Sequence, residues 1–254
     1  MLTPDAPAIE VADLHKRYGA FVAVDGVSFT VPTGEVFGLV GSNGAGKTTT
    51  LECLLGLREP DAGTVRVFGL DPARQGAEVR LRVGAQLQAA QLPPRLRVGE
   101  ALVWFASFYP HTVDVDELLA RWGLTDKRST AFGDLSGGQR QRLFLALALL
   151  HSPELVCFDE LTTGLDPRAR RDTWRQVESL RDEGRTVLVV THDMEEAERL
   201  CDRVAMLDGG RVVALGRPAD LVEEAGVRSL EDVFLARTGP GSTTPPASVE
   251  MEVR

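Results

Sequence analysis

Residues 41–48, with the sequence Gly-Ser-Asn-Gly-Ala-Gly-Lys-Thr, constrain the fold of this chain more than any other segment. They fit the pattern G-x-x-x-x-G-K-[ST], in which backbone N–H groups cradle phosphates. Residues 36–40 before them form an apolar run of strand length, and residues 48–57 after them place Leu51, Leu54 and Leu55 on one side of a helix. The sequence therefore predicts a phosphate loop between a strand and a helix N-terminus, within an α/β fold.

Lys47 in this loop stands out against the composition. The chain has 28 Lys and Arg residues, and the only lysines are Lys16, Lys47 and Lys127. A compact ammonium can lie between two phosphate groups as a point charge, where the planar guanidinium of Arg would not fit the same loop. We therefore expect Lys47 to bind the phosphates, and Thr48 to supply a hydroxyl group for Mg²⁺.

Two further segments point to the same chemistry. Residues 135–139 read Leu-Ser-Gly-Gly-Gln and precede a predicted helix, for which Ser136 can be the N-cap. The apolar run 155–158 then ends in the carboxylates Asp159 and Glu160. Beside a phosphate loop, one carboxylate can hold the hydration shell of Mg²⁺ while the other polarises an attacking water.

The remaining pattern predicts an antiparallel and a parallel sheet. Residues 9–11, 27–31 and 64–67 alternate as half-exposed antiparallel strands do, whereas 36–40, 155–158 and 187–190 are continuous apolar runs typical of buried parallel strands. Residues 204–207 and 211–215 flank Asp-Gly-Gly and predict a hairpin. Helices are expected to begin at Asp166-Pro167, at Pro218 and near residue 229, and Gly184 should end the first of these.

These elements predict one domain over residues 5–238. Residues 92–150 lack strand patterns and are expected to form a helical lobe, and 216–238 a C-terminal extension. Residues 239–248 contain only Gly, Pro, Ser, Thr and Ala, so 239–254 are predicted to be a disordered tail.

Composition excludes several other functions. The 254 residues are 43% hydrophobic and carry a net charge of −9 without a strong basic run, which argues against nucleic acid as a partner. The three cysteines are widely separated, as expected of free thiols in a reducing compartment. The longest apolar run, 143–150, is far shorter than the roughly 20 residues needed to span a bilayer, and residues 1–10 show no signal peptide. Any membrane role would have to come through a partner.

Taken together, the segments described above resemble the ATP-binding subunit of ABC transporters over nearly all of residues 9–238. The resemblance implies the phosphate-loop core of an ABC ATPase, with an antiparallel β subdomain and a helical subdomain. It implies ATP and Mg²⁺ as ligands, Glu160 as catalytic base, His192 as the switch histidine at the γ-phosphate, and Gln88 as the glutamine that senses Mg²⁺ and the membrane partner. Gln86 is the rival for the last role. The Mg²⁺ residues would be Thr48, Gln88 and Asp159. The other implied nucleotide contacts are Tyr18 on adenine, Gly41, Ser42, Asn43, Gly44, Ala45, Gly46, Lys47, Thr48 and Thr49 of the loop, Ser136, Gly137, Gly138 and Gln139 of the family signature, and Asp166 of the D-loop.

One departure is visible, because Leu161 follows Glu160 where the family usually has Pro, and this puts the rigidity of that loop in doubt.

In this family the signature of one subunit closes over the ATP held by another. The resemblance therefore implies a second copy or a paralogous ATPase, polytopic permease subunits, and a peripheral place on the cytoplasmic face of the membrane. Leu102, Phe105 and Tyr109 follow helical spacing and are expected either to pack in the core or to line a groove for the permease.

Residues 229–235, followed by Thr238-Gly239, are similar to the end of drug-resistance and ABC-2-type exporter subunits. The leading expectation is export of a drug or antibiotic, that is, multidrug efflux. A lipid or glycan exporter and an importer are the alternatives. Soluble ABC ATPases of DNA repair or translation are less similar, because the span between residues 48 and 135 holds no heptads or Cys cluster and the chain holds one cassette. The presence of Lys47, Asp159, Glu160 and His192 disfavours a binding module without catalysis.

Overall fold

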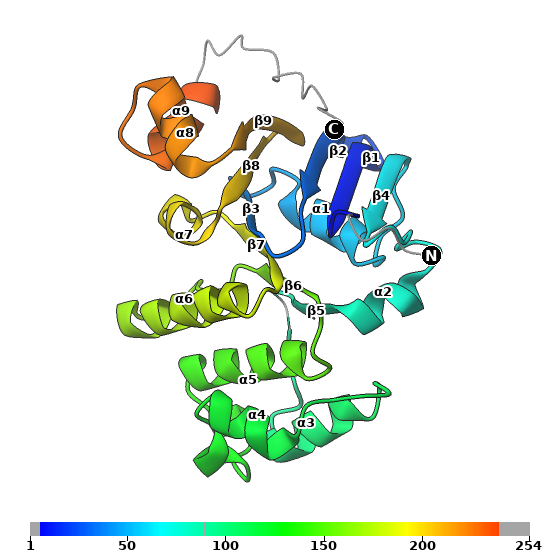
Figure 1. Ribbon diagram of the computed structural model, residues 1–254, viewed down its shortest axis with the longest axis vertical. Helices are drawn as coiled ribbons and strands as arrows, with labels where there is room; N and C mark the ends of the chain where they lie inside the picture. The colour runs from blue at the N-terminus through cyan, green and yellow to red at the C-terminus, as the bar shows by residue number, and fades with distance from the viewer. Residues whose placement is uncertain (1–5, 89, 239–254) are drawn as a thin grey trace.

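The computed structural model describes residues 6–88 and 90–238, which form two sheets with helices around them (Figure 1). The predicted tail, 239–254, lies outside these residues. The elements before the helical segment are β1 (Ile9–Tyr18), β2 (Phe21–Val31), β3 (Val36–Gly41), α1 (Lys47–Leu54), β4 (Ala62–Val67), α2 (Gly76–Arg82) and β5 (Val83–Gln86). Those that follow are α3 (Val98–Ala106), α4 (Val115–Arg121), α5 (Gly137–Leu149), β6 (Leu155–Asp159), α6 (Pro167–Asp182), β7 (Thr186–Thr191), α7 (Met194–Leu200), β8 (Arg203–Asp208), β9 (Arg211–Gly216), α8 (Pro218–Ala225) and α9 (Leu230–Thr238).

The smaller sheet is antiparallel, as its alternating sequence predicts. Its strand order is β2-β1-β4, and Val11 pairs with Phe29 on one side and with Val65 on the other. Ile9 and Val11 alternate as buried residues, and Leu14 is buried beyond a register shift. The predicted antiparallel β subdomain is therefore present.

The larger sheet has the order β5-β6-β7-β3-β8-β9 and is parallel except for the edge strand β9. The continuous apolar runs β3, β6 and β7 lie at its centre and are buried on both faces. Successive residues of β7 face opposite sides, so that Val187 and Leu188 belong to different hydrophobic clusters. The predicted parallel core and the β8–β9 hairpin are both confirmed.

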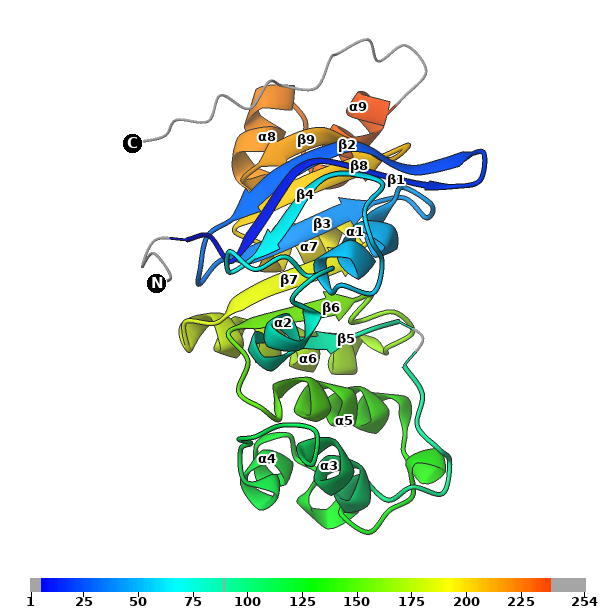
Figure 2. The same cartoon turned by 90° about the vertical axis from the view of Figure 1, so that its right-hand side faces the viewer.

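Helices cover both faces of this core. Helix α1 lies between the two sheets, while α6 and α7 pack on the other side of β7 (Figure 2). At one end of the molecule α8 and α9 pack beside β9, and at the opposite end α3, α4 and α5 form a helical part (Figure 1). Residues 92–150, all of them described, contribute no strand to either sheet. The limits predicted for the lobe and the C-terminal extension stay predictions.

The predicted helix boundaries follow from capping. Asp166 accepts hydrogen bonds from the backbone N–H groups of Arg168 and Ala169 at the start of α6, where Pro167 takes the first helical position. Ser136 and Gln139 form a capping box at the start of α5. Among the described residues, no helix is both long and apolar enough to cross a membrane.

Candidate active site

The phosphate loop lies where β3 ends and α1 begins, at the carboxyl edge of the parallel strands. Gly44 and Gly46 have φ angles of +84° and +99°, which side chains disfavour. A Cβ on Gly46 would also lie 2.4 Å from the carbonyl oxygen of Ala23, so that only Gly fits there. The loop thus follows a tight path, and Asn43, Gly44 and Gly46 line the cavity beside it.

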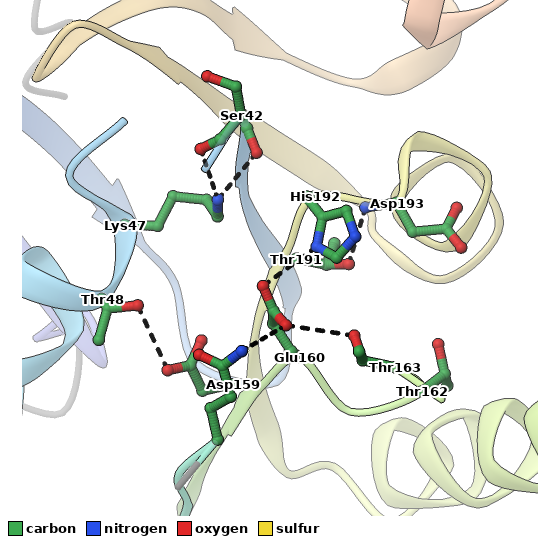
Figure 3. Close-up of polar contacts among 12 residues, drawn as sticks. Ser42, Lys47, Thr48, Asp159, Glu160, Thr162, Thr163, Thr191, His192 and Asp193 are labelled. Atoms are coloured by element: carbon green, nitrogen blue, oxygen red, sulfur yellow. Dashed lines mark hydrogen bonds and ion pairs between the residues drawn. The ribbon is translucent and has the colours of Figure 1, made fainter. Parts of the chain in front are cut away.

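Lys47 lies within the loop, and it is the first residue of α1. Its Nζ donates to the carbonyl oxygens of Gly41 at 2.8 Å and Ser42 at 2.9 Å (Figure 3). Burial lowers the pKa of Lys47, while the nearby carboxylates of Glu160 and Asp159 oppose this shift. The ammonium is therefore held by the loop itself, close to the acidic pair.

The acidic pair follows from the strand β6. Asp159 is its last residue and is buried, and its Oδ2 lies 3.4 Å from the Thr48 hydroxyl (Figure 3). Its other oxygen, Oδ1, is buried without a hydrogen-bond partner among the described residues. Burial raises the pKa of Asp159 to about 6, and the negative charge of Glu160 adds to this rise. A buried carboxylate oxygen without a donor, next to a hydroxyl group, suits a hard cation such as Mg²⁺.

Glu160 is the centre of a polar cluster. Its Oε2 accepts from Gln88 Nε2 at 2.7 Å and from the Thr163 hydroxyl at 3.3 Å. Its Oε1 lies 3.1 Å from His192 Nδ1, at the end of β7 (Figure 3). Three separate loops, after β5, β6 and β7, thus meet at one carboxylate.

The structure separates the two rival glutamines. Gln88 lies beyond the end of β5 and reaches Glu160, whereas Gln86 is buried within the strand. Gln86 and Gln141 exchange two amide hydrogen bonds of 3.2 and 2.9 Å. This arrangement brings Gln88, and not Gln86, to the acidic pair.

A cavity of about 340 Å³ connects the phosphate loop with Glu160. Beyond them it reaches Tyr18 at the end of β1 and Phe21 at the start of β2, which face each other as a cross-strand pair. Both aromatic rings are exposed, and Phe21 is 60% exposed. Phe21 was not among the residues expected at the site, although its place directly across the short turn from Tyr18 could have indicated it. The lining residues are Tyr18, Phe21, Ala23, Asn43, Gly44, Gly46, Lys47, Thr48, Thr49, Gln88 and Glu160.

Other predicted site residues lie outside this cavity. Ser136, Gly137, Gly138 and Gln139, all in the described part of the chain, do not line it. Ser136 and Gly137 are exposed at the start of α5, and a Cβ on Gly137 would meet no atom within 4 Å. Asp166 is an exposed helix cap, and the hydrogen bonds that it accepts from two backbone N–H groups lower its pKa. The structure therefore brings the loop, Asp159, Glu160, Gln88 and His192 together and leaves the signature segment facing outward.

Leu161, which stands where the family usually has Pro, is held by packing. Its side chain is 1% exposed and belongs to the hydrophobic cluster on the α6 face of the core. Burial of an apolar side chain of this size stabilises its position by roughly 2 kcal/mol. The residue after Glu160 is thus fixed by packing where a Pro would fix it through φ.

Comparison with known proteins identifies the family. Residues 24–163 match the family model described as ABC transporter. The chain belongs to the ABC transporter family. "Nod factor export ATP-binding protein I" of Burkholderia lata is 44% identical over 225 residues, which cover 87% of this chain and 74% of that protein. The protein of the same name from Rhizobium etli is 43% identical over 222 residues, covering 85% of this chain and 70% of its own length.

A solved structure described as the ATP-binding subunit of an ABC transporter superimposes with a TM-score of 0.82. It is 30% identical and covers 91% of this chain and 99% of its own. The chain is thus an ABC transporter ATP-binding subunit that hydrolyses ATP, with the mixed α/β fold expected of one. ABC ATPase subunits in general dimerise and work with membrane permease subunits.

Proposed function

We propose that this chain powers an exporter through ATP hydrolysis at a site completed by a second ATPase subunit. The observation that carries the proposal is the convergence of Gln88, Thr163 and His192 on Glu160, beside the cavity of the phosphate loop. Glu160 is the general base that orients and deprotonates the attacking water, and His192 contacts the γ-phosphate. The loop N–H groups and Lys47 bind the β- and γ-phosphates, where negative charge gathers.

Mg²⁺ fits the oxygen atoms beside the loop. The Thr48 hydroxyl, the Gln88 side chain and Oδ1 of Asp159, which has no hydrogen-bond partner among the described residues, would hold the ion and its water shell. Bound there, Mg²⁺ would neutralise the charge that develops on the phosphates. Tyr18 and Phe21 border the same cavity, and their rings can stack on the adenine base.

The outward-facing signature segment supports a shared site. Ser136 and Gly138 lie at the N-terminus of α5, a 13-residue helix whose first N–H groups suit an anion. Since these residues lie outside the cavity of their own chain, they are available for the γ-phosphate bound by a second copy or a paralogue. Residues 5–238 would act as the ATPase domain, attached through permease subunits to the cytoplasmic face of the membrane, with no nucleic acid involved.

Replacing Glu160 by Gln tests the chemical step. Gln keeps the size of the side chain but cannot accept the proton of water, so the turnover number for ATP should fall roughly 100-fold or more. The Kd for ATP should change little, because the phosphate loop is untouched. A variant that hydrolyses ATP at the rate of the unmodified chain would refute the base assignment.

The cargo is proposed from the relatives. Proteins 43–45% identical to this chain are named for Nod factor export, and none of these names mentions a drug. They favour the alternative of a lipid or glycan exporter over the drug or antibiotic exporter that the sequence first suggested. A strain without this chain should retain a lipid- or glycan-type compound inside the cell and keep its drug susceptibility. Unchanged export together with raised drug susceptibility would restore the drug interpretation.

A further inference from the structure

Glu196 is a buried acid that the proposed chemistry does not use. It lies in α7, its side chain is 1% exposed, and burial raises its pKa. Its Oε1 accepts two hydrogen bonds, one from the Thr162 hydroxyl at 2.8 Å and one from Trp174 Nε1 at 3.2 Å. A carboxyl group is costly to bury, and its retention at such a point suggests that these two contacts matter.

The partners of Glu196 belong to the segment that carries the base. Thr162 is two residues beyond Glu160, and its neighbour Thr163 donates its hydroxyl to Glu160 Oε2. Trp174 lies in α6, the helix into which the same segment runs. Glu196 thus contacts the loop after β6 at its beginning and again in the helix that follows it.

On its own side, Glu196 belongs to the segment that carries the histidine. Its backbone N–H donates to Asp193 Oδ1 at 3.1 Å, and Asp193 directly follows His192. The Nη1 atom of Arg170 in α6 lies 3.6 Å from Asp193 Oδ2, and this ion pair joins the two segments a second time. Glu196 therefore connects the loop of Glu160, through its carboxyl group, to the loop of His192, through its backbone N–H.

The backbone at Glu160 explains why such a connection is needed. Glu160 has a φ of +54°, a left-handed conformation that a residue with a side chain adopts only under constraint. Its N–H donates to the Val190 carbonyl at 2.8 Å, which fixes the strand side of the turn. Thr162, held by Glu196, fixes the other side.

We propose that Glu196 is a positioning residue for ATP hydrolysis: it holds Thr162 and Trp174 so that the strained turn keeps Glu160 Oε1 3.1 Å from His192. The inference rests on the proposed roles of Glu160 and His192. It assigns Glu196 no contact with ATP, since its side chain is buried in the core with only 1% exposed.

Steady-state ATPase kinetics of the full chain test this inference. Glu196→Ala and Thr162→Val each break the connection and should lower kcat roughly 10-fold or more, because small displacements of catalytic groups are costly. The KM for ATP should stay within about twofold, since neither residue contacts the phosphate loop. Glu196→Gln retains an acceptor oxygen for both donors and should recover most of kcat. If Glu196→Ala fails to fold, Thr162→Val, which only exchanges a hydroxyl for a methyl, still decides the matter.

Val177→Ala is the matched control for loss of packing. Val177 is buried in α6 but makes no polar contact with the turn, so its truncation should lower Tm and leave kcat at 25 °C unchanged. Equal kcat values for Thr162→Val, Glu196→Ala and the unmodified chain would overturn the inference. The inference would also fail if Glu196→Ala and Thr162→Val, at a Tm equal to that of Val177→Ala, lowered kcat no more than Val177→Ala does. If Glu160→Gln is inactive while the Glu196 and Thr162 variants are fully active, this inference alone fails; if Glu160→Gln is active, the proposed base fails first.

Discussion

At the scale of single residues, the site places polar groups where their burial lowers the stability of the fold. Asp159 is 2% exposed, and only one of its oxygens has a hydrogen-bond partner among the described residues. Glu160 keeps a strained φ at the next position. Stability is thus given up locally for the geometry of phosphate chemistry, as is common at active sites.

Asp159→Asn should therefore stabilise the chain. The pKa of Asp159 is about 6 in the folded state against 3.8 ordinarily, so between these values the folded chain binds more protons than the unfolded chain. Stability consequently falls as pH rises from about 4 to 6, and the loss persists at pH 7. Removing the carboxylate should raise the free energy of unfolding at pH 7, without metal or nucleotide, by about 1–2 kcal/mol.

Urea unfolding at several pH values measures this effect. The Asp159→Asn chain should also show a flatter dependence of stability on pH between about 4 and 6. Asp182→Asn, at a side chain that is 76% exposed, is the control and should change stability by less than about 0.5 kcal/mol. A destabilised Asp159→Asn chain would show that the carboxylate contributes a favourable contact instead.

At the scale of elements, α3 carries an apolar surface that the spacing of its residues did not predict. Leu102 is fully buried, and Tyr109 just beyond the helix stacks on His151 with ring centroids 4.0 Å apart. Phe105 is partly buried and packs against the same hydrophobic cluster as Leu102, so the core-packing expectation holds for these two residues, whereas Tyr109 is only half-buried. The exposed apolar side chains are instead Val103, Trp104 and Phe108, which we call the α3 patch. Exposed apolar patches mark sites of protein contact, and we propose that this one meets a permease subunit.

Phe108→Glu should separate docking from chemistry. Phe108 is 62% exposed, so a charge there costs little folding energy, and it lies outside the ATP cavity. We expect the variant to hydrolyse ATP normally in isolation but to lose co-purification with the permease subunits. Leu235→Glu in α9, at a side chain 60% exposed, is the matched control and should still co-purify. Retention of the permease by Phe108→Glu would exclude the patch as the contact.

Elements differ in how well the sequence predicts them. Capping residues and continuous apolar runs act locally, so α5, α6, β3, β6 and β7 could be placed from the sequence alone. The order of strands could not, because β3 pairs with β7 and β8 through contacts between residues more than a hundred positions apart. Likewise, nothing in the local sequence sets Glu196 apart from its acidic neighbours Glu195 and Glu198. Its burial depends on Trp174 and Thr162, which reach it only in the folded chain.

At the scale of the whole molecule, the two halves of the nucleotide site lie apart. The phosphate loop and Glu160 border one cavity, while the signature segment begins α5 outside it. The resemblance to ABC transporter subunits already implied a site shared between two chains, and the proposal of such a site is supported by a signature segment that does not line the cavity of its own chain. Two chains arranged head to tail would pair each loop with the signature of the other, and such a closure is the motion that an exporter could use.

The most direct test of this account is sedimentation equilibrium of the Glu160→Gln chain with and without Mg-ATP. We expect monomers without nucleotide and dimers with it, because bound ATP that is not hydrolysed would join the loop of one chain to Ser136 of the other. Adding Ser136→Arg to the same chain should abolish the dimer and leave ATP binding at the loop intact. A chain that stays monomeric with ATP bound, or that dimerises as well with Arg at position 136, would contradict the shared site.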